Sequence, residues 1–321
     1  MFTMSILILS NHHDTHVNFV LPELEKRGLK YKSVRVEEYT HTFTLETKMN
    51  SALEIQRIDS VDLSEVTSIW YRRPILPEIK NNNPLYKQLI TDEIEGYISF
   101  FFTALKGKTW VSYPPNIELA RNKILQLQFA KEEGLTIPET LITTDFDSFK
   151  ELYEKHKGRV IIKGIKGGWY DKGGKHNYLL FTSLLDKSKL PTKESLSMSP
   201  CLFQEYVEKK LELRVSVIGN KVFTAALHSQ ERESSKIDWR LGSDTKLRHT
   251  IYDLPREIKE KLINITKRFG LNFGAYDLIV TPQEEYVFLE LNPNGQWGWI
   301  QEKTGMPLRE SLVDLLQHGT N

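Results

Sequence analysis

The sequence predicts a protein of mixed α/β and α+β architecture, and three patterns indicate this class. A strand, a helix and a second strand follow one another within residues 5–36, which favours a right-handed parallel crossover. An apolar strand at 159–163 runs into a glycine-rich loop. Two apolar segments, 273–280 and 285–291, follow each other closely, as strands of an antiparallel sheet do.

Length and composition restrict the class of protein. The chain has 321 residues, enough for about two domains or one α/β unit with insertions. Lys and Arg total 43 against 42 Asp and Glu, so no global field favours nucleic acid or an anionic membrane. The single cysteine, Cys201, excludes an internal disulfide, and the apolar start is too short for a membrane span. We expect a cytoplasmic protein with neither nucleic acid nor membrane as partner.

The N-terminal segment, residues 1–115, is predicted to be an α/β domain. Ser5 to Leu9 forms its first strand, and the following helix ends at Arg27 and Gly28. Strands are expected at 30–36 and 68–71. An apolar, mostly helical stretch covers 84–106, and we attribute its hydrophobic residues to core packing.

Residues 116–200 and 201–321 are predicted as a central and a C-terminal domain. The central domain begins with a helix over 123–134 and contains the strand 159–163, whose loop has five glycines between residues 164 and 174. The C-terminal domain is expected to be an antiparallel-rich α+β unit. Its elements are strands at 201–207, 213–218, 221–227, 273–280 and 285–291, and a helix near 255–269.

A metal site is predicted near the end of the chain. Side chains two apart on a strand share a face, so Glu290 and Asn292 project together, opposite Leu289 and Leu291. Asp277 lies in the preceding apolar strand, where an unpaired carboxylate is costly. Three hard oxygen donors suit Mg²⁺, which completes its shell from water and phosphate. The alternative is that these groups are merely solvated at strand ends.

A phosphate site is predicted at the glycine-rich loop. Lys163 leaves its strand at the mouth of this loop, where exposed amide groups could wrap phosphate oxygens. The spacing is not that of a P-loop, and a surface hairpin is the alternative. The nearby Lys123 and the predicted metal site favour a phosphate-binding loop over a surface hairpin.

These motifs together resemble an ATP-grasp ligase, and they occur in that family's order. They are Lys123, Lys163 with its loop, Gln204 to Val207, Glu212, Asp277, and Glu290 to Pro293. The resemblance implies an ATP-grasp fold with the nucleotide between the central and C-terminal domains. It also implies that Lys123, Lys163, Gly167 and Gly168 contact ATP phosphates.

The remaining roles implied by the resemblance concern adenosine and metal. Gln204, Glu205, Tyr206 and Val207 would form the adenine hinge, with Glu205 to Val207 acting through backbone groups, and Glu212 would bind ribose. Asp277, Glu290 and Asn292 would hold two Mg²⁺ ions, for which Mn²⁺ could substitute.

A narrower resemblance covers nearly the whole chain. It rests on residues 69–74, 238–240, 252–255 and 288–297, whose sequences are IWYRRP, DWR, YDLP and FLELNPNGQW. These segments are similar to those of microviridin-type, or graspetide, peptide macrocyclases. The resemblance implies a ribosomal precursor peptide, with leader and core, as partner. It also implies crosslinks from Asp or Glu side chains to Ser or Thr hydroxyls or Lys amines. A homodimer is left open.

Three residues are candidates for the acyl-transfer chemistry. Arg240 or Arg214 could hold an acyl phosphate and the substrate carboxylate by bidentate hydrogen bonds. Asp238 is a candidate base for the attacking hydroxyl, with a salt bridge to Arg240 as an equally weighted alternative.

Other conspicuous residues have simpler interpretations. His12, His13 and His16 have metal-ligand spacing, but they lie where a helix begins and Asp14 could cap it. Arg72 and Arg73 could orient a domain interface or the substrate. Trp297 and Trp299 could line the substrate cleft or pack in the core.

Three functions remain in competition. The first is a peptide macrocyclase, and the second is an ATP-grasp ligase that adds an amino acid to a small molecule or a protein terminus. The third is a nucleotide-binding regulatory protein without turnover, and the intact lysines and carboxylates weigh against it.

Overall fold

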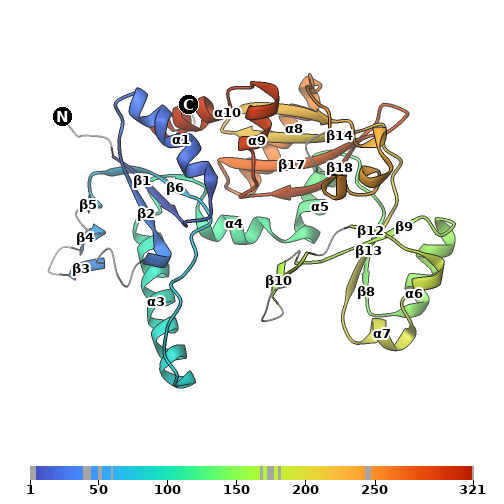
Figure 1. Ribbon diagram of the computed structural model, residues 1–321, viewed down its shortest axis with the longest axis horizontal. Helices are drawn as coiled ribbons and strands as arrows, with labels where there is room; N and C mark the ends of the chain where they lie inside the picture. Colours follow the sequence, from blue (N-terminus) through green and yellow to red (C-terminus); the bar gives the residue numbers. More distant parts are fainter. Residues whose placement is uncertain are drawn as a thin grey trace.

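The computed structural model describes residues 5–38, 45–49, 53–58, 61–166, 169–171, 177–179, 182–242 and 247–319. Within these ranges the strands form five sheets, and the three larger ones follow one another along the chain (Figure 1). The mixed α/β and α+β class predicted from the sequence is confirmed. No described helix is both long enough and apolar enough to cross a membrane.

The N-terminal sheet is parallel and has the order β2-β1-β6-β7. Its strands are β1 (Ser5–Ser10), β2 (Lys30–Arg35), β6 (Val66–Tyr71) and β7 (Thr109–Val111). Helix α1 (Thr15–Lys26) connects β1 to β2, which confirms the parallel arrangement. Asp14 caps α1 by accepting a hydrogen bond from the His16 amide at 2.9 Å.

Two parts of this region differ from expectation. A small antiparallel sheet of β3 (Leu45–Met49), β4 (Leu53–Ile58) and β5 (Val61–Asp62) was not predicted. Helix α3 (Pro84–Ala104) lies where it was predicted, but Phe101 is its only buried residue. Core packing therefore explains only the C-terminal end of α3.

The central sheet is antiparallel, with the order β12-β9-β13-β8. Its strands are β8 (Thr140–Thr143), β9 (Val160–Lys163), β12 (Ser183–Leu184) and β13 (Cys201–Glu205). Helices α6 (Phe146–Lys155) and α7 (Lys193–Ser197) cover one face through Phe149 and Leu196. A separate hairpin joins β10 (Trp169–Asp171) and β11 (Asn177–Leu179).

The boundary placed between residues 200 and 201 needs correction. β13 pairs with β8 and β9, so it belongs to the central sheet and not to the C-terminal one. The sheet to which β13 belongs is decided by its pairing with strands far away in the sequence. The local sequence pattern of residues 201–205 does not show this pairing.

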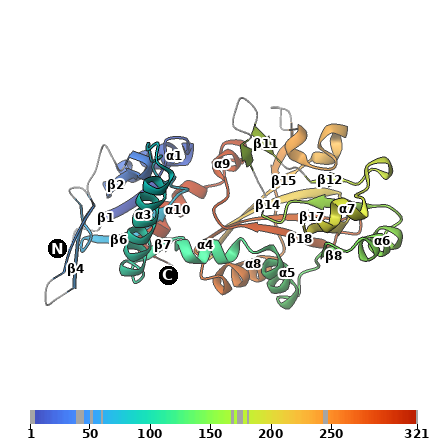
Figure 2. The same cartoon turned by 90° about the horizontal axis from the view of Figure 1, so that it is seen from below.

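The C-terminal sheet is antiparallel, with the order β16-β15-β14-β17-β18. Its strands are β14 (Leu211–Ile218), β15 (Lys221–Leu227), β16 (His249–Ile251), β17 (Phe273–Val280) and β18 (Tyr286–Asn292). Helices α5 (Lys123–Glu132) and α8 (Arg256–Arg268) lie together along one side of this sheet (Figure 2).

Alternation along these strands separates a core face from a second face. Leu213, Val215, Tyr276 and Leu278 point to the α8 side and are buried there. The residues between them therefore point to the opposite face.

The remaining helices join the parts. They are α4 (Pro114–Ala120), α9 (Gly298–Thr304) and α10 (Leu308–His318). Short 3-10 turns cover Val36–Glu38, Lys187–Lys189, Ser229–Glu231, Glu233–Ser235 and Trp239–Gly242. One hydrophobic cluster combines residues of β1, α1, α9, α10 and the C-terminal sheet, so the N-terminal and C-terminal regions share a core.

Candidate active site

A row of three charged residues crosses the C-terminal sheet on the face opposite α8. Arg214 of β14 is the register partner of Asp277 of β17, which is the partner of Glu290 of β18. The Arg214 Nη1 atom lies 2.5 Å from Asp277 Oδ1. Two carboxylates are thereby brought side by side, as the metal-site prediction requires.

A β-bulge in β18 changes the environment of this row. The register shifts between Asp277 and Leu278, so Leu289 is an extra residue opposite β17. Leu289 and Glu290 line the same cavity, whereas Leu291 is buried in the core. The prediction that Leu289 shares the face of Leu291 was therefore wrong.

A buried glutamine holds this strand in place. Gln126 of α5 donates from Nε2 to the Leu291 carbonyl at 2.8 Å and accepts from the Leu291 amide at 2.9 Å. Gln126 Nε2 also donates to the Ala120 carbonyl at 2.6 Å. Sequence reasoning missed Gln126, although a polar residue on the buried side of α5 was a readable signal.

The cavity lies between the central and C-terminal sheets, and we call it the intersheet cleft. Residues of β9, β13, β14, β17 and β18 line it, together with Ile237, Asp238 and the start of the 3-10 turn Trp239–Gly242. Its lining residues are Pro138, Ile161, Lys163, Thr182, Gln204, Glu205, Tyr206, Val207, Lys209, Glu212, Ile237, Asp238, Trp239, Arg240, Asp277, Ile279, Leu289 and Glu290.

Two lysines stand beside the carboxylates. Lys163 lines the intersheet cleft, and burial lowers its pKa although Glu290 acts in the opposite direction. Lys123, at the start of α5, donates to the Gly164 carbonyl at 2.8 Å and lies 3.7 Å from Glu290 Oε2. Lys123 therefore connects Glu290 of β18 to the first residue of the glycine-rich loop. Gly167 and Gly168 lie outside the described residues.

The predicted hinge lines the same cleft. Gln204 is buried and donates to Thr140 Oγ1 at 2.8 Å, while its Oε1 atom has no partner among the described residues. The Glu205 carboxylate accepts from the Glu139 amide at 2.8 Å, so this side chain serves a structural contact. β13 ends at Glu205, and Tyr206 and Val207 continue along the cleft.

Glu212 is held at the cleft by two donors. Its Oε1 atom accepts from Lys209 Nζ at 2.7 Å and from Ser229 Oγ at 2.8 Å. Lys209 also donates to the Ile237 carbonyl at 2.9 Å and is almost fully buried. Lys209 was not predicted, although it follows the hinge directly in the sequence.

Asp238 and Arg240 form a bidentate ion pair. Arg240 donates from Nε to Asp238 Oδ1 at 2.8 Å and from Nη2 to Oδ2 at 2.6 Å, and the Thr182 amide also donates to Oδ2. Burial would raise the pKa of Asp238, but these partners outweigh it and lower the pKa. The contacts correspond to the salt-bridge alternative more than to a free base.

The pKa values of the two carboxylates in the row are shifted in opposite directions. Burial raises the pKa of Asp277 to about 7, against the influence of Arg214. Burial also acts to raise the pKa of Glu290, but Lys123 and Lys163 outweigh it and lower the pKa. Bringing an additional cation close would favour ionisation of Asp277.

The oxygen donors of Asp277, Glu290 and Asn292 fit Mg²⁺ only when further ligands complete its coordination shell. No three His, Cys, Asp or Glu side chains within the described ranges are grouped to hold a metal ion. Asp277 and Glu290 supply carboxylates, and Asn292 supplies an amide oxygen that accepts one hydrogen bond from the Asn294 amide. Such an incomplete oxygen shell is what Mg²⁺ uses with phosphates.

The segment after Asn292 is fixed by a buried cluster that we call the domain junction. It consists of Asp14, His16 and Arg72 from the N-terminal region, with Asn294 and Gly295. Arg72 Nη1 donates to the Asn294 carbonyl, Asn294 Oδ1 and the Gly295 carbonyl, each at 3.0 Å. Arg72 Nε lies 2.9 Å from Asp14 Oδ2.

His16 completes the junction as an acceptor. Its Nε2 atom accepts from the Trp297 and Gly298 amides, each at 3.0 Å. Nδ1 then carries the proton toward Asp14 Oδ1, 3.1 Å away. The junction thus supports the structural interpretation of His16 and Arg72, and Trp297 is buried in the core beside them.

Comparison with known proteins assigns the family. The RimK-like ATP-grasp domain model matches residues 120–316, and the MvdD pre-ATP grasp domain model matches residues 5–118. The chain belongs to the RimK-like ATP-grasp family. The ATP-grasp fold predicted from the sequence is confirmed. This family uses ATP and Mg²⁺, which agrees with the lysines and incomplete oxygen shell of the intersheet cleft.

Solved structures similar to this ATP-grasp protein extend over nearly its whole length. Macrocyclase MdnC from Microcystis aeruginosa, bound with precursor peptide MdnA, has a TM-score of 0.85 at 27% identity and covers 97% of this chain and 99% of its own. A Chryseobacterium gregarium RiPP-associated ATP-grasp ligase, in complex with ADP and a leader and core peptide, has a TM-score of 0.85 at 26% identity. It covers 98% of this chain and 96% of its own.

Curated relatives match a shorter part of this ATP-grasp protein. Glutamate–LysW ligase ArgX from Sulfolobus acidocaldarius is 22% identical and covers 73% of the chain and 82% of its own length. A probable alpha-L-glutamate ligase from Coxiella burnetii is 27% identical and covers 71% of the chain and 75% of its own length. The resemblance to macrocyclase-type ATP-grasp ligases stated from the sequence is confirmed.

Proposed function

We propose that this ATP-grasp ligase is a peptide macrocyclase. It would activate Asp or Glu side chains of a ribosomal precursor peptide as acyl phosphates and join them to Thr or Ser hydroxyls, or to Lys amines. The observation that carries the proposal is similarity to macrocyclase structures over 97% of the chain, including the pre-ATP grasp region. The glutamate ligases match less of the chain.

The intersheet cleft would hold the nucleotide. Lys123 and Lys163 would hold ATP phosphates, and Gly167 and Gly168 would add backbone donors. The Glu205 to Val207 backbone would hold adenine beside the unpartnered Gln204 Oε1, and the Glu212 carboxylate would bind ribose. Asp277, Glu290 and Asn292 would hold two Mg²⁺ ions, or Mn²⁺ in their place. Mg²⁺, when bound, neutralises phosphate charge.

The reaction would proceed in two steps. A carboxylate oxygen of the peptide attacks the γ-phosphorus, ADP leaves, and a mixed anhydride forms. The hydroxyl or amine then attacks the acyl carbon, and phosphate leaves with one former carboxylate oxygen and takes up the proton that the nucleophile loses. Arg240 or Arg214 would hold the carboxylate and the anhydride. Asp238, with its lowered pKa, would orient Arg240 instead of acting as a base.

Intact mass of the peptide product tests the proposal. The probe is the peptide from a short neighbouring reading frame with repeated Thr and Asp or Glu, incubated with enzyme, ATP and Mg²⁺. We expect loss of one water mass for each bond, and ester links should reopen in mild alkali whereas amides survive. Addition of an amino-acid mass would overturn the proposal in favour of a glutamate-type ligase.

A further inference from the structure

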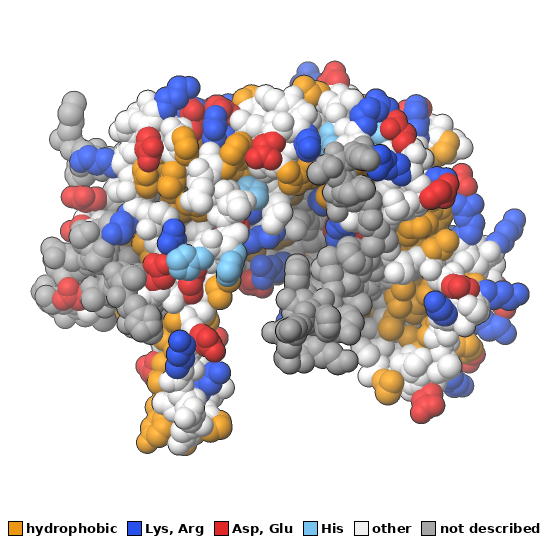
Figure 3. All heavy atoms as spheres, in the orientation of Figure 1, with side chains coloured by type: hydrophobic (Ala, Val, Ile, Leu, Met, Phe, Trp, Pro, Cys, Tyr) orange, Lys and Arg blue, Asp and Glu red, His pale blue; other side chains and the backbone are white. Residues whose placement is uncertain are grey.

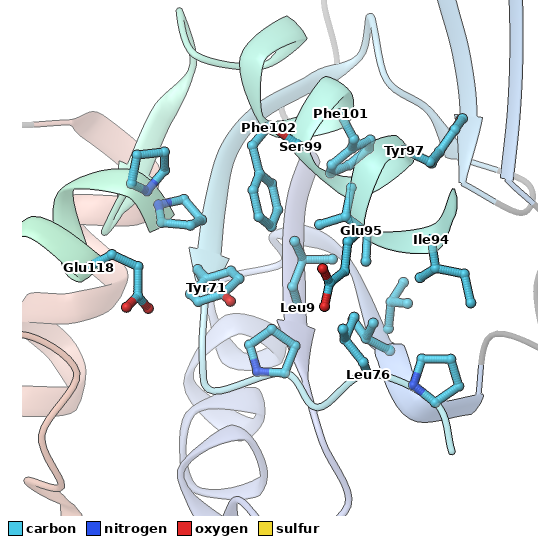
Figure 4. Close-up of a pocket in the computed structure, with 17 residues that line it drawn as sticks. Leu9, Tyr71, Leu76, Ile94, Glu95, Tyr97, Ser99, Phe101, Phe102 and Glu118 are labelled. Carbon is cyan, nitrogen blue, oxygen red and sulfur yellow. The ribbon is translucent and has the colours of Figure 1, made fainter. Parts of the chain in front are cut away.

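One lysine of the intersheet cleft is almost completely buried. Lysine and arginine side chains normally project from a protein surface, as those drawn in blue in Figure 3 do. Lys209 is an exception, because only 5% of its side chain is exposed. The cavity beside α3, by contrast, is lined mainly by apolar side chains, including Leu9, Leu76 and Phe102 (Figure 4). A cation enclosed in the cleft wall needs specific partners.

The ammonium group of Lys209 joins two parts of the cleft wall. Its Nζ atom donates to Glu212 Oε1 on β14 at 2.7 Å and to the Ile237 carbonyl at 2.9 Å. An ammonium group has three hydrogens and accepts none, so it makes both contacts at once. Ile237 directly precedes Asp238 in the chain. A single nitrogen atom therefore ties the strand that carries Glu212 to the backbone before Asp238.

A second contact ties the same stretch of chain to the same carboxylate. Ser229 is fully buried and donates from Oγ to Glu212 Oε1 at 2.8 Å. Ser235, also fully buried, donates from Oγ to the Ser229 carbonyl at 2.6 Å. We call residues 229–240 the arginine segment. The arginine segment is thus held to Glu212 at its first residue and, through Lys209, near its end.

The end of the arginine segment lies against both arginines proposed to hold the anhydride. The Trp239 ring centroid is 5.1 Å from the Arg214 Cζ atom. Hydrogen bonding to Asp238 raises the pKa of Arg240 in spite of burial, and Glu290 acts in the same direction. Movement of the arginine segment would therefore change the surroundings of both guanidinium groups.

One oxygen of the Glu212 carboxylate is left for a ligand. Lys209 and Ser229 both donate to Oε1, and no group in the described part of the chain donates to Oε2. A ribose hydroxyl that donates to Oε2 would fix the orientation of the carboxylate. Hydrogen bonds in such a chain restrain one another, so the restraint would extend to Lys209.

We propose that Lys209 is a positioning residue that couples ribose binding at Glu212 to the placement of Arg240. The ribose fixes Glu212, Glu212 fixes the Lys209 ammonium group, and this group fixes the Ile237 carbonyl next to the Asp238–Arg240 ion pair. Nucleotide binding thereby orders the arginine segment before the carboxylate is activated. The inference rests on the proposed function, because it needs a nucleotide in the intersheet cleft, but it does not depend on the identity of the peptide.

Amide hydrogen exchange of the full chain tests the coupling with two nucleotides. One is ADP, and the other is dideoxy-ADP, in which hydrogen replaces both ribose hydroxyls; calorimetry establishes that each saturates the protein. ADP should slow exchange in residues 229–240 at least about threefold relative to dideoxy-ADP. Lys209→Met should abolish this difference. Lys210→Met, the neighbouring lysine with 51% of its side chain exposed, should keep it.

Kinetics of ring formation give a second measurement. Lys209→Met should lower kcat at saturating ATP at least about tenfold, because Arg240 is no longer held in place. A residue that served only the ribose site would raise the KM for ATP and leave kcat unchanged. Lys210→Met should keep the parent kcat and KM.

Equal exchange in residues 229–240 with the two nucleotides would overturn the inference, even if the enzyme forms rings. An unchanged kcat in folded Lys209→Met would do so as well. If circular dichroism shows that Lys209→Met does not fold, the two nucleotides on the parent chain still decide. Protection by ADP in a protein that forms no ring would support the coupling and contradict the macrocyclase proposal. Failure of ADP to bind would contradict both.

Discussion

Charged side chains are enclosed in two places in this molecule, the domain junction and the intersheet cleft, and their surroundings differ. At the junction Arg72 lies against Asp14 and donates to three oxygens of Asn294 and Gly295. In the cleft Asp277 and Glu290 stand side by side with Lys163 close by. The first group joins two domains, and the second faces a cavity.

The pKa values of Asp14 at the junction and Asp277 in the cleft are shifted in opposite directions. Burial acts to raise the pKa of Asp14, yet His16 and Arg72 lower it to about 2. In the cleft burial raises the pKa of Asp277 to about 7, even with Arg214 beside it. Asp14 is stabilised in its ionised form by its partners, as expected of a structural ion pair. Asp277 and Glu290 repel each other when both are ionised, and a bound cation would favour ionisation of both.

The largest expected effect on activity is at Glu290. Glu290→Gln keeps the shape of the side chain and removes its charge, so ATP turnover should fall at least about a hundredfold, about 2.7 kcal/mol. Some thermal stability should also be lost, because Lys123 and Lys163 stabilise the ionised carboxylate, so turnover is compared at a temperature at which both proteins are folded. Turnover is measured as ADP release, with the exposed Glu260→Gln on α8 as control. A folded Glu290→Gln protein with parent activity would remove the metal role.

At the domain junction, a substitution should reduce stability more than activity. Arg72→Met leaves the Asp14 carboxylate buried without its ion-pair partner, and we expect a loss of about 3–5 kcal/mol in unfolding free energy. Urea unfolding of this variant is compared with that of Arg256→Met, whose side chain is 93% exposed. Equal unfolding midpoints for the two variants would show that the junction contributes nothing to domain attachment.

Lys163 should affect ligand binding more than folding. Lys163→Met should weaken ATP binding about tenfold, about 1.4 kcal/mol, because a phosphate contact is lost. Stability should be kept, since burial already disfavours the charged amine and lowers its pKa. Nucleotide titration by calorimetry measures the effect, with the exposed Lys150→Met on α6 as control. Unchanged affinity would return Lys163 to a purely structural role.

The smallest expected effect is a pH dependence at the junction. Burial lowers the pKa of His16 below its ordinary value of 6.5, so the folded state resists a proton that the unfolded state binds. His16 therefore contributes a loss of stability as pH falls below about 6.5. His228 and His249 also have lowered pKa values, so the measured quantity is the difference from His16→Gln.

That difference, obtained from urea unfolding at neutral and mildly acidic pH, should shrink as the solution becomes acidic. The variant lacks the titrating ring, so it loses less stability than the parent over the same range. A difference that stays constant would mean that His16 does not titrate differently in the folded and unfolded states.

Local patterns predicted much of the fold and the cleft. Alternation along β14 and β17 already places Arg214 and Asp277 on a face away from Leu213 and Tyr276. The bulge that turns Leu289 into the cleft was not predictable, because the register of β18 is set by its pairing with β17. Strand pairing likewise moved β13 into the central sheet.

The junction could not be predicted from local patterns either. Arg72 meets Asp14 only after two strands of the N-terminal sheet pair, and it meets Asn294 across 222 residues of chain. The motif at residues 69–74 indicated that Arg72 has a structural or functional role, but it did not show which residues Arg72 contacts. The core-packing interpretation of α3 was wrong for all but its C-terminal end, because apolar residues on a helix do not show whether the same chain covers them.

Oxygen transfer during the reaction tests the central claim most directly. The precursor peptide is labelled with ¹⁸O in its Asp and Glu side-chain carboxylates and incubated with enzyme, ATP and Mg²⁺. Activation as an acyl phosphate requires that one labelled oxygen appear in the released phosphate for each water lost from the peptide, with one ADP formed. Ring formation with unlabelled phosphate would contradict the account, because the carboxylate would then have been activated without attack on the γ-phosphorus.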